Sequence, residues 1–339
     1  MGGGAPITVQ SMTNTQTSDI DSTVQQILSF ERAGGDLSRS AINSLEDAQA
    51  ILEIKKQTSL PFIADIQFDP QLALYAAQYG ADALRINPGN IGDQEAVKKI
   101  VYLCRDKNIP IRVGVNSGSI SKEMLKKYGG VNVHSLVYSA LEEVEVIKKL
   151  GWEQIVVSIK SSSVPTMIEA CQLFSKLSDL PQHLGVTEAG PSYSGIIKSA
   201  VGIGSLLSSG IGDTIRVSLT ENPVEEIRAA NEILRSLALK NRGVNLISCP
   251  TCARTRINLI GLVKEAQRRL STVDKDITVA IMGCPVNGPG EAREADIGIA
   301  GTKGSGVIFK KGKVLFQVPE DKLLDCLMEE VQRMTNENH

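Results

Sequence analysis

Three cysteines near the C-terminal end have the residue types and spacing of a metal site. Cys249 and Cys252 form a C-x2-C pair in SCPTC, and Cys284 follows 32 residues later in MGCPVNGPGE. A four-iron cluster or a structural zinc ion normally takes four nitrogen or sulfur ligands, and this group supplies three thiolates. The sequence therefore predicts an incomplete set of soft ligands, which suits catalysis better than electron storage.

The fourth ligand of such a site must come from another residue. No histidine lies between Leu184 and Asn338, so a zinc site with three cysteines and a histidine has no local candidate. Glu291, at the end of the run Gly-Pro-Gly-Glu, is the obvious carboxylate. A hard oxygen is a weak ligand for a soft iron–sulfur cluster, so a substrate could displace it.

A second group of candidate residues is cationic and recurs near the C-terminal ends of predicted strands. Side chains two positions apart share a face of a strand, so Asn116 points the same way as Arg112, and Ser218 the same way as Arg216. Several cations buried together are costly unless an anion binds them, which predicts a diphosphate or another phosphorylated small molecule. The cations are Arg85 in LRIN, Arg112 in IRVGVN, Lys160 in VSIK and Arg216 in TIRVSL.

Both groups also have simpler explanations. The cations could pair with carboxylates such as Asp65, Asp69 and Glu188 instead of binding a ligand. The CPTC segment could be a thioredoxin-like redox pair, although Cys284 and the glycine-rich run argue against this. Two other classes of function are a zinc-stabilised scaffold and a barrel enzyme of the pterin-binding type without a redox metal.

The segments that must position the cations alternate in type from residue 7 to about residue 238. Each short β-rich run precedes an amphipathic helical pattern, and eight such units predict an α/β fold, a TIM (β/α)8 barrel, over residues 1–240. The strand that begins at Asp36 is the weakest prediction, because Ser38 and Ser40 stand where β-branched residues are typical. The eight predicted strands begin at Ile7, Asp36, Pro61, Asp82, Pro110, Gln154, His183 and Asp213.

The regular alternation of strand and helix patterns ends after residue 240. A helix is expected from about Thr255 to Leu270, followed by short strands in ITVAIMGC, DIGIA, GVIFK and KVLFQV and a closing helix from about Glu320. This pattern predicts a smaller α+β domain over residues 241–339, which contains the three grouped cysteines.

Composition limits the possible partners. The net charge is −2 and the pI is near 6.0, so no global basic field attracts nucleic acid or an anionic membrane. No apolar run approaches the roughly 20 residues that a membrane span needs. The N-terminal sequence has neither a basic nor an apolar targeting segment, so we expect a cytoplasmic protein whose cysteines are thiols or ligands.

Eight sequence blocks, which occur in family order over nearly the whole chain, resemble one known family. The chain is similar to bacterial 4-hydroxy-3-methylbut-2-enyl diphosphate synthase, the iron–sulfur enzyme of the non-mevalonate isoprenoid pathway. The last two blocks are the most specific. The blocks are GGGAPITVQSMTNTQT, ADIQFD, LRINPGNIG, IRVGVNSGS, HLGVTEAG, GIGDTIRVSLT, RGVNLISCPTCART and GCPVNGPGEAREADIG.

This resemblance implies an activity and a cofactor. The activity is an oxidoreductase that acts on CH or CH2 groups, with flavodoxin or ferredoxin as electron donor. The reaction is the two-electron ring opening and dehydroxylation of 2-C-methyl-D-erythritol 2,4-cyclodiphosphate, whose C3 oxygen would bind the open iron of a 4Fe-4S cluster. The resemblance also implies a homodimer in which the cluster domain of one chain caps the barrel of the other.

The resemblance assigns roles to particular residues of this chain. The cluster ligands would be Cys249, Cys252, Cys284 and Glu291. Glu291 could also donate a proton, and Asn287 could orient the substrate oxygen. The residues that would bind the diphosphate are Arg39, Arg85, Arg112, Asn116, Lys160, Arg216 and Ser218.

Three features depart from the family pattern. The family usually has a further stretch ahead of GGGAPI. Gln67 stands where the family has histidine in ADIHFD, which removes a titratable group from the predicted site. The segment AGGDLSRSAIN also differs from the usual AGADIVRVA, although it retains Arg39.

Overall fold

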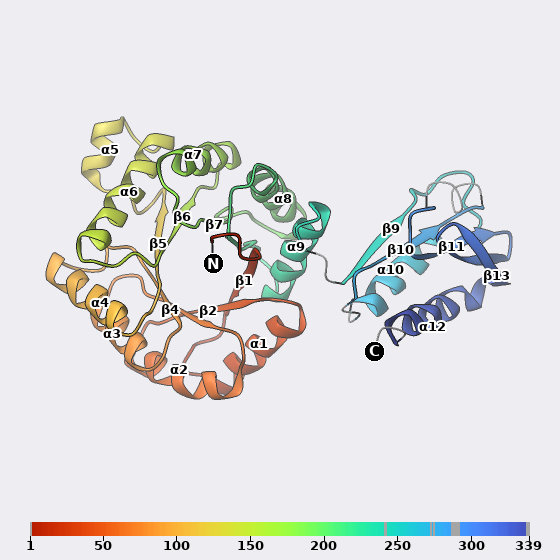
Figure 1. The fold of residues 1–339 in the computed structure, drawn as a ribbon, viewed down its shortest axis with the longest axis horizontal. Coiled ribbons are helices and arrows are strands. Elements are labelled where there is room, and N and C mark those ends of the chain that lie inside the picture. The colour runs from red at the N-terminus through yellow and green to blue at the C-terminus, as the bar shows by residue number, and fades with distance from the viewer. Residues whose placement is uncertain (1, 241–242, 272, 274, 286–291, 337–339) are drawn as a thin grey trace. The chain divides into compact units, whose positions relative to one another are not determined.

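A computed structural model of the chain describes residues 2–240, 243–271, 273, 275–285 and 292–336. The chain divides into two compact units, Met1–Lys240 and Asn241–His339, shown in Figure 1.

The first unit is a barrel of eight parallel strands in the order β6-β5-β4-β3-β2-β1-β8-β7, which confirms the predicted fold class. A single bridge between Val157 and Gln182 brings the β6 edge to the segment before β7 and nearly closes the barrel. The strands are β1 (Thr8–Met12), β2 (Leu37–Ala41), β3 (Phe62–Asp65), β4 (Ala83–Ile86), β5 (Ile111–Asn116), β6 (Ile155–Lys160), β7 (His183–Leu184) and β8 (Thr214–Ile215).

Helices surround this barrel (Figure 1), and the core lies between the helices and the strands. Most helices begin at a polar side chain that accepts a hydrogen bond from a first-turn N–H group, as Asp19, Ser44 and Asn132 do. The helices are α1 (Ile20–Arg32), α2 (Leu45–Gln57), α3 (Pro70–Gln78), α4 (Gln94–Asp106), α5 (Lys122–Tyr128), α6 (Val133–Lys149), α7 (Val164–Leu177), α8 (Ser192–Ser208) and α9 (Pro223–Ser236).

The strand with the weakest sequence pattern, β2, forms in register with both neighbours. Its serines are fully buried and satisfy their hydroxyl groups locally. Ser40 Oγ accepts a hydrogen bond of 2.8 Å from Thr13, and Ser38 Oγ donates one of 3.1 Å to the Pro61 carbonyl. These side-chain hydrogen bonds make serine acceptable where strand propensity alone disfavours it.

The second unit contains a five-stranded sheet in the order β13-β12-β11-β10-β9, in which β9, β10 and β11 run parallel. Helices α10 and α12 pack on it around one aliphatic core. The elements are β9 (Val244–Ser248), α10 (Leu259–Leu270), β10 (Ile277–Met282), β11 (Ile297–Thr302), β12 (Ser305–Lys310), β13 (Lys313–Pro319), the 3-10 turn η1 (Glu320–Lys322) and α12 (Leu323–Asn336).

The expected start of α10 at Thr255 was wrong by one turn. Asn258 caps the helix, because its Oδ1 accepts a hydrogen bond from the Gly261 N–H at 3.2 Å. Thr255 instead binds the cysteine loop, since its Oγ1 accepts from the Cys252 N–H at 3.2 Å. In the described residues, no helix is long and apolar enough to cross a membrane.

Candidate active site

Five cations, four on different strands and one directly after β8, meet inside the barrel. Lys160 lies in the combined field of the four arginines. Only two carboxylates, Asp65 and Glu226, form ion pairs with members of this group among the described residues. The cations therefore outnumber these carboxylates by five to two, which favours an anionic ligand. The five are Arg39, Arg85, Arg112, Lys160 and Arg216.

Asp65 links two of these cations at the end of β3. Its Oδ2 lies 3.8 Å from Arg39 Nε, and its Oδ1 lies 3.4 Å from Arg85 Nη1. Burial raises the pKa of Asp65, but the arginines outweigh burial and the net pKa is below its ordinary value. Pairing with Asp65 was one alternative to ligand binding, and the structure shows that it accounts for part of the positive charge.

Glu226, on the first turn of α9, holds Arg216 with two parallel contacts. Arg216 Nη2 lies 3.1 Å from Oε1, and Arg216 Nε lies 3.2 Å from Oε2. Oε2 also accepts a hydrogen bond of 2.9 Å from Ser11, and Oε1 one of 3.0 Å from the Leu219 N–H. The paired guanidinium group is thereby fixed in one orientation.

Arg112 is held by a neutral partner. Its Nη1 donates a hydrogen bond of 2.6 Å to Gln10 Oε1, and its side chain is 5% exposed. Three nitrogen atoms in the described part of the chain are buried here without a hydrogen-bond partner, namely Arg112 Nη2, Gln10 Nε2 and His183 Nε2. Burial and the nearby Arg112 and Lys160 lower the pKa of His183 well below its ordinary value, so this imidazole is neutral.

Two glycines make room for the cations. A Cβ atom at Gly114 would lie 2.6 Å from Arg85 Nε, and one at Gly185 would lie 3.3 Å from Lys160 Nζ. Lys160 forms no ion pair with the described residues. Burial and the four arginines lower its pKa well below the ordinary value of a lysine. A bound anion would favour the protonated form of this amine.

The other two predicted diphosphate ligands lie beside this group. Asn116 pairs in register with Lys160 at the ends of β5 and β6, and its Oδ1 accepts from the Gly118 N–H at 3.2 Å. Arg216 and Ser218 follow β8, which ends at Ile215, so the predicted eighth strand is shorter than expected. The Arg216 N–H still donates to the Leu184 carbonyl at 3.0 Å, which positions the segment.

Gln67 occupies the position of the family's histidine. Its Nε2 donates a hydrogen bond of 3.2 Å to Asp65 Oδ2, so the amide supports the carboxylate that pairs with Arg39 and Arg85. Glutamine can therefore orient Asp65, but it cannot transfer a proton near neutral pH.

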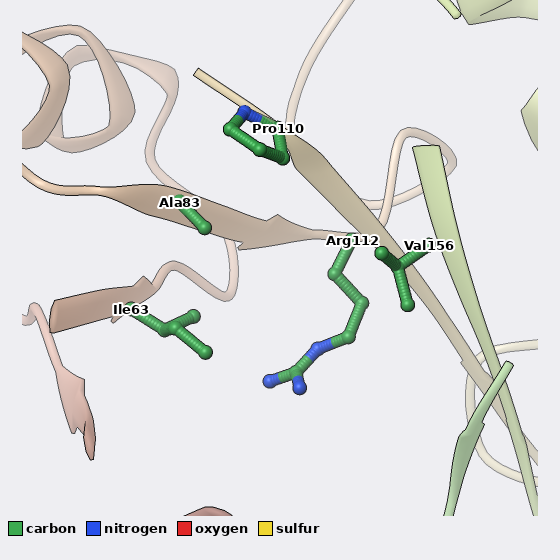
Figure 2. Close-up of a pocket in the computed structure, with 5 residues that line it drawn as sticks. All are labelled: Ile63, Ala83, Pro110, Arg112 and Val156. Atoms are coloured by element: carbon green, nitrogen blue, oxygen red, sulfur yellow. The ribbon is translucent and has the colours of Figure 1, made fainter. Parts of the chain in front are cut away.

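A small hollow lies at the opposite end of the strands (Figure 2). Ile63, Ala83 and Val156 line it near the first residues of their strands, together with Pro110. Figure 2 shows Arg112 reaching from its strand into the space between Ile63 and Val156. Ligands of such barrels bind at the C-terminal ends of the strands, so this largely apolar hollow is not the candidate site.

In the second unit, two grouped cysteines follow neighbouring parallel strands. Cys249 comes directly after β9, and Cys284 lies two residues after β10. The Gly283 N–H donates to Cys249 Sγ at 3.1 Å, which places that sulfur beside the backbone next to Cys284. Cys252 lies in the exposed loop, where a hydrogen bond from the Arg254 backbone N–H lowers the pKa of its thiol.

The donor set fits an iron–sulfur cluster. The soft sulfur atoms of Cys249 and Cys284 follow neighbouring strands at one end of the sheet, and a lowered pKa makes the Cys252 thiol easier to deprotonate. Among the described residues, no three Cys, His, Asp or Glu side chains are already grouped for a metal ion. Asn287 and Glu291 lie outside the described residues, so their predicted roles remain predictions.

Comparison with known proteins gives the family. The model of the GcpE TIM-barrel domain matches residues 1–231, and that of the GcpE protein C-terminal domain matches residues 245–333. The chain belongs to the GcpE family. This membership confirms the resemblance found in the sequence.

Curated GcpE relatives carry the name 4-hydroxy-3-methylbut-2-en-1-yl diphosphate synthase (flavodoxin). The protein from Clostridium tetani is 56% identical over 98% of this chain and 96% of its own length. The protein from Fusobacterium nucleatum is 54% identical over 100% of this chain and 94% of its own length. The protein from Geobacter sulfurreducens is 49% identical over 100% of this chain and 96% of its own length.

One solved structure supports the barrel fold of this GcpE chain. The type I 3-dehydroquinate dehydratase of Clostridium difficile aligns with a TM-score of 0.50 and 11% identity, over 70% of this chain and 93% of that chain. At this identity the likeness concerns the fold alone.

The sequence analysis missed Gln10 and Glu226 as parts of the site. Gln10 lies in ITVQSM, where a polar side chain in a buried strand was the available signal. Glu226 is 2% exposed, although it lies on an otherwise amphipathic helix. Its sequence neighbourhood resembles an ordinary acidic first turn, so only the three-dimensional contact with Arg216 reveals its role.

Proposed function

We propose that this chain reduces 2-C-methyl-D-erythritol 2,4-cyclodiphosphate to 4-hydroxy-3-methylbut-2-enyl diphosphate in isoprenoid biosynthesis, with flavodoxin as electron donor. The names of its full-length relatives support the product and the donor. The observation that carries the proposal for this chain is the excess of buried cations in the barrel, which suits a diphosphate.

In this proposal the barrel, residues 1–240, is the substrate domain. Arg39, Arg85 and Arg216 are held by carboxylates and present guanidinium groups in fixed orientations. Neither Arg112 nor Lys160 has a carboxylate within ion-pair distance among the described residues, so a bound phosphoryl group would be the first counter-charge for each. Asn116 and Ser218 add polar groups beside them. The set binds both phosphoryl groups and leaves the carbon skeleton towards the open end of the barrel.

The second unit, residues 241–339, is the proposed cluster domain. Cys249, Cys252 and Cys284 would hold a 4Fe-4S cluster, with Glu291 as the fourth ligand. When bound, the cluster supplies electrons one at a time and a Lewis-acidic iron. A protonated Glu291 that is no longer bound to the cluster would give a proton to the departing hydroxyl group, and Asn287 would orient that hydroxyl group. These assignments rest on the sequence and on the donor chemistry of the three thiols.

We also propose that two chains associate, with the cluster domain of each capping the barrel of its partner. An apolar face on α8 supports self-association, because Tyr193, Ile197 and Val201 follow one another at one-turn spacing and are 83%, 48% and 53% exposed. Lys198 is the one charged residue in the sequence of this helix.

The test is turnover by anaerobically purified protein. Iron, sulfide and zinc content and an absorption spectrum would be measured first, followed by product formation from the cyclodiphosphate with reduced flavodoxin. About four irons per chain, an absorption band of the cluster and substrate-dependent product support the proposal. One zinc ion per chain, or iron-loaded protein that forms no product, would contradict it.

A further inference from the structure

A second polar cluster lies at the end of β4, outside the group of five cations. It joins helix α6 to the loop of residues 87–92, which follows β4. Within the described residues, Ser139 Oγ, Glu143 Oε2 and Asn87 Nδ2 are buried and have no hydrogen-bond partner. Ser139 and Glu143 are one turn apart on α6 and therefore share a face. Buried polar atoms normally have partners, so this cluster needs an explanation.

Gly89 brings Glu143 and the loop together. A Cβ atom at this position would lie 3.3 Å from Glu143 Oε1 and 3.3 Å from Asn87 Oδ1. The φ angle of Gly89 lies outside the left-handed region, so glycine is required for space and not for backbone conformation. Asn87 Oδ1 in turn accepts a hydrogen bond of 3.0 Å from the Gly89 N–H. The Glu143 carboxyl group is thus packed against the loop backbone.

The loop is directly connected to a cation of the site. Arg85 precedes Asn87 by two residues on a strand of only four residues. Its guanidinium group lies across Gly114 and pairs with Asp65 at 3.4 Å. A displacement of the loop would therefore move the backbone that carries Arg85, while its side chain remains tied to β3 and β5.

We propose that Glu143 is a positioning residue, which binds the loop of residues 87–92 and thereby holds Arg85 in place for the diphosphate. This inference rests on the proposed function, because it takes Arg85 to be a diphosphate ligand. Asn87 Nδ2 and Glu143 Oε2 both lack partners among the described residues, and a protonated carboxyl group can accept from such an amide and donate to a loop carbonyl.

The surroundings of Glu143 favour that protonated form. Burial raises the pKa of Glu143 to about 8, Arg85 opposes this shift, and the neighbouring Glu142 adds to it. The loop itself has no titratable side chain. Arg112 on β5 and Lys160 on β6 belong to the barrel interior. The charged residues of the adjoining helices are exposed, namely Lys122, Glu123, Lys126 and Lys127 on α5 and Glu169 and Lys176 on α7.

The test compares Glu143→Gln, Glu143→Leu and Glu142→Gln, all loaded with iron, for kcat, KM and melting temperature between pH 6 and pH 9. Glutamine keeps a donor and an acceptor, whereas leucine keeps neither. We expect Glu143→Leu to raise KM for the cyclodiphosphate about tenfold with little change in kcat, and Glu143→Gln to retain the wild-type KM. Glu142 is exposed on the same helix, so Glu142→Gln should keep the wild-type KM near pH 7 and move the pH rise only slightly lower, because Glu142 helps to raise the pKa of Glu143.

The pH profile gives a second readout. The wild-type KM should rise more steeply above about pH 8 than the KM of Glu143→Gln, because only the wild type loses the Glu143 proton, whereas Lys160 titrates in both. This comparison still tests the proposal if the leucine variant fails to fold. A wild-type KM in folded Glu143→Leu, or an unchanged pH rise in Glu143→Gln, would overturn it.

Arg85→Gln separates this inference from the proposed function. If Arg85→Gln raises KM and Glu143→Leu does not, the positioning role fails while the diphosphate site stands. If Arg85→Gln also leaves KM unchanged, Arg85 is not a diphosphate ligand. The ligand role of Arg85 and the positioning role of Glu143 then both fail.

Discussion

Arg112 and Gln10 lie on opposite strands of the barrel and are joined by a hydrogen bond of 2.6 Å between Nη1 and Oε1. A buried arginine is usually compensated by a carboxylate. Here the partner is a neutral amide, which fixes the guanidinium group without cancelling its charge. The positive charge at the centre of the barrel therefore remains available to an anionic ligand.

Gln10→Glu should separate stability from affinity. The new carboxylate would pair with Arg112, so we expect a higher melting temperature and a Kd for the cyclodiphosphate that is weaker by about tenfold or more. Gln10→Leu is the control, because it removes the hydrogen bond and leaves the charge of the site unchanged. Calorimetric titration measures both affinities, and equal losses in the two variants would show that charge is not the cause.

Lys160 should take up a proton when the diphosphate binds. Its pKa is well below the ordinary value because of burial and four arginines, and an anion reverses the effect of those arginines. The buffer supplies this proton. At pH 8 the measured binding enthalpy should therefore depend on the ionisation enthalpy of the buffer. Lys160→Met should lose this dependence and bind more weakly. Wild-type binding without proton uptake would contradict the predicted protonation change.

Glu226→Gln should destabilise the barrel. It removes the carboxylate that pairs with Arg216 and leaves a largely buried guanidinium group without its counter-charge, at a cost of roughly 3 kcal/mol in the free energy of unfolding. Glu225→Gln, one residue earlier, breaks only an exposed pair with Arg228 and should cost less than about 0.5 kcal/mol. Denaturant unfolding compares the two, and similar losses would argue against a special role for Glu226.

Replacing any one of Cys249, Cys252 and Cys284 by serine should abolish cluster assembly, because each removes one of three thiolates. Iron and sulfide content after anaerobic reconstitution measures the effect. Cys326→Ser is the matched control in the same unit, since that cysteine packs beside the core away from the loop. A wild-type iron content in any of the three variants would refute that ligand.

Ile197→Glu should weaken self-association by placing a charge in the apolar face of α8. Light scattering with size-exclusion chromatography should show a shift from dimer to monomer at a given concentration. Leu177→Glu on α7, where the native side chain is 48% exposed, introduces the same charge outside that face and should leave the dimer intact. Dissociation by both variants, or by neither, would rule out α8 as the interface.

The fold and the cation group were predictable from the sequence for a local reason. Strand alternation places Arg112 and Asn116 on one face, and the βα repeat directs that face into the barrel. The structure brings the five predicted cations together, although their role in binding substrate remains a prediction.

The partners of these cations were not predictable, because they depend on contacts that are distant in sequence. Gln10 and Arg112 are separated by 102 residues, and nothing near either residue indicates the other. Glu226 is close to Arg216 in sequence, but it lies on the next helix, where a glutamate usually faces solvent. The predicted lengths of β7 and β8 were also too long, because each of these strands has only two residues.

The single bridge between Val157 and Gln182 has a consequence for the motions of the barrel. Every other pair of neighbouring strands shares a ladder of at least two residue pairs, so the β6–β7 junction has the fewest hydrogen bonds to break. Amide hydrogens there should exchange with deuterium before those of β2 to β5. Local opening at this junction would move the strand that carries Lys160, while the strands that carry Arg39, Arg85 and Arg112 stay rigid.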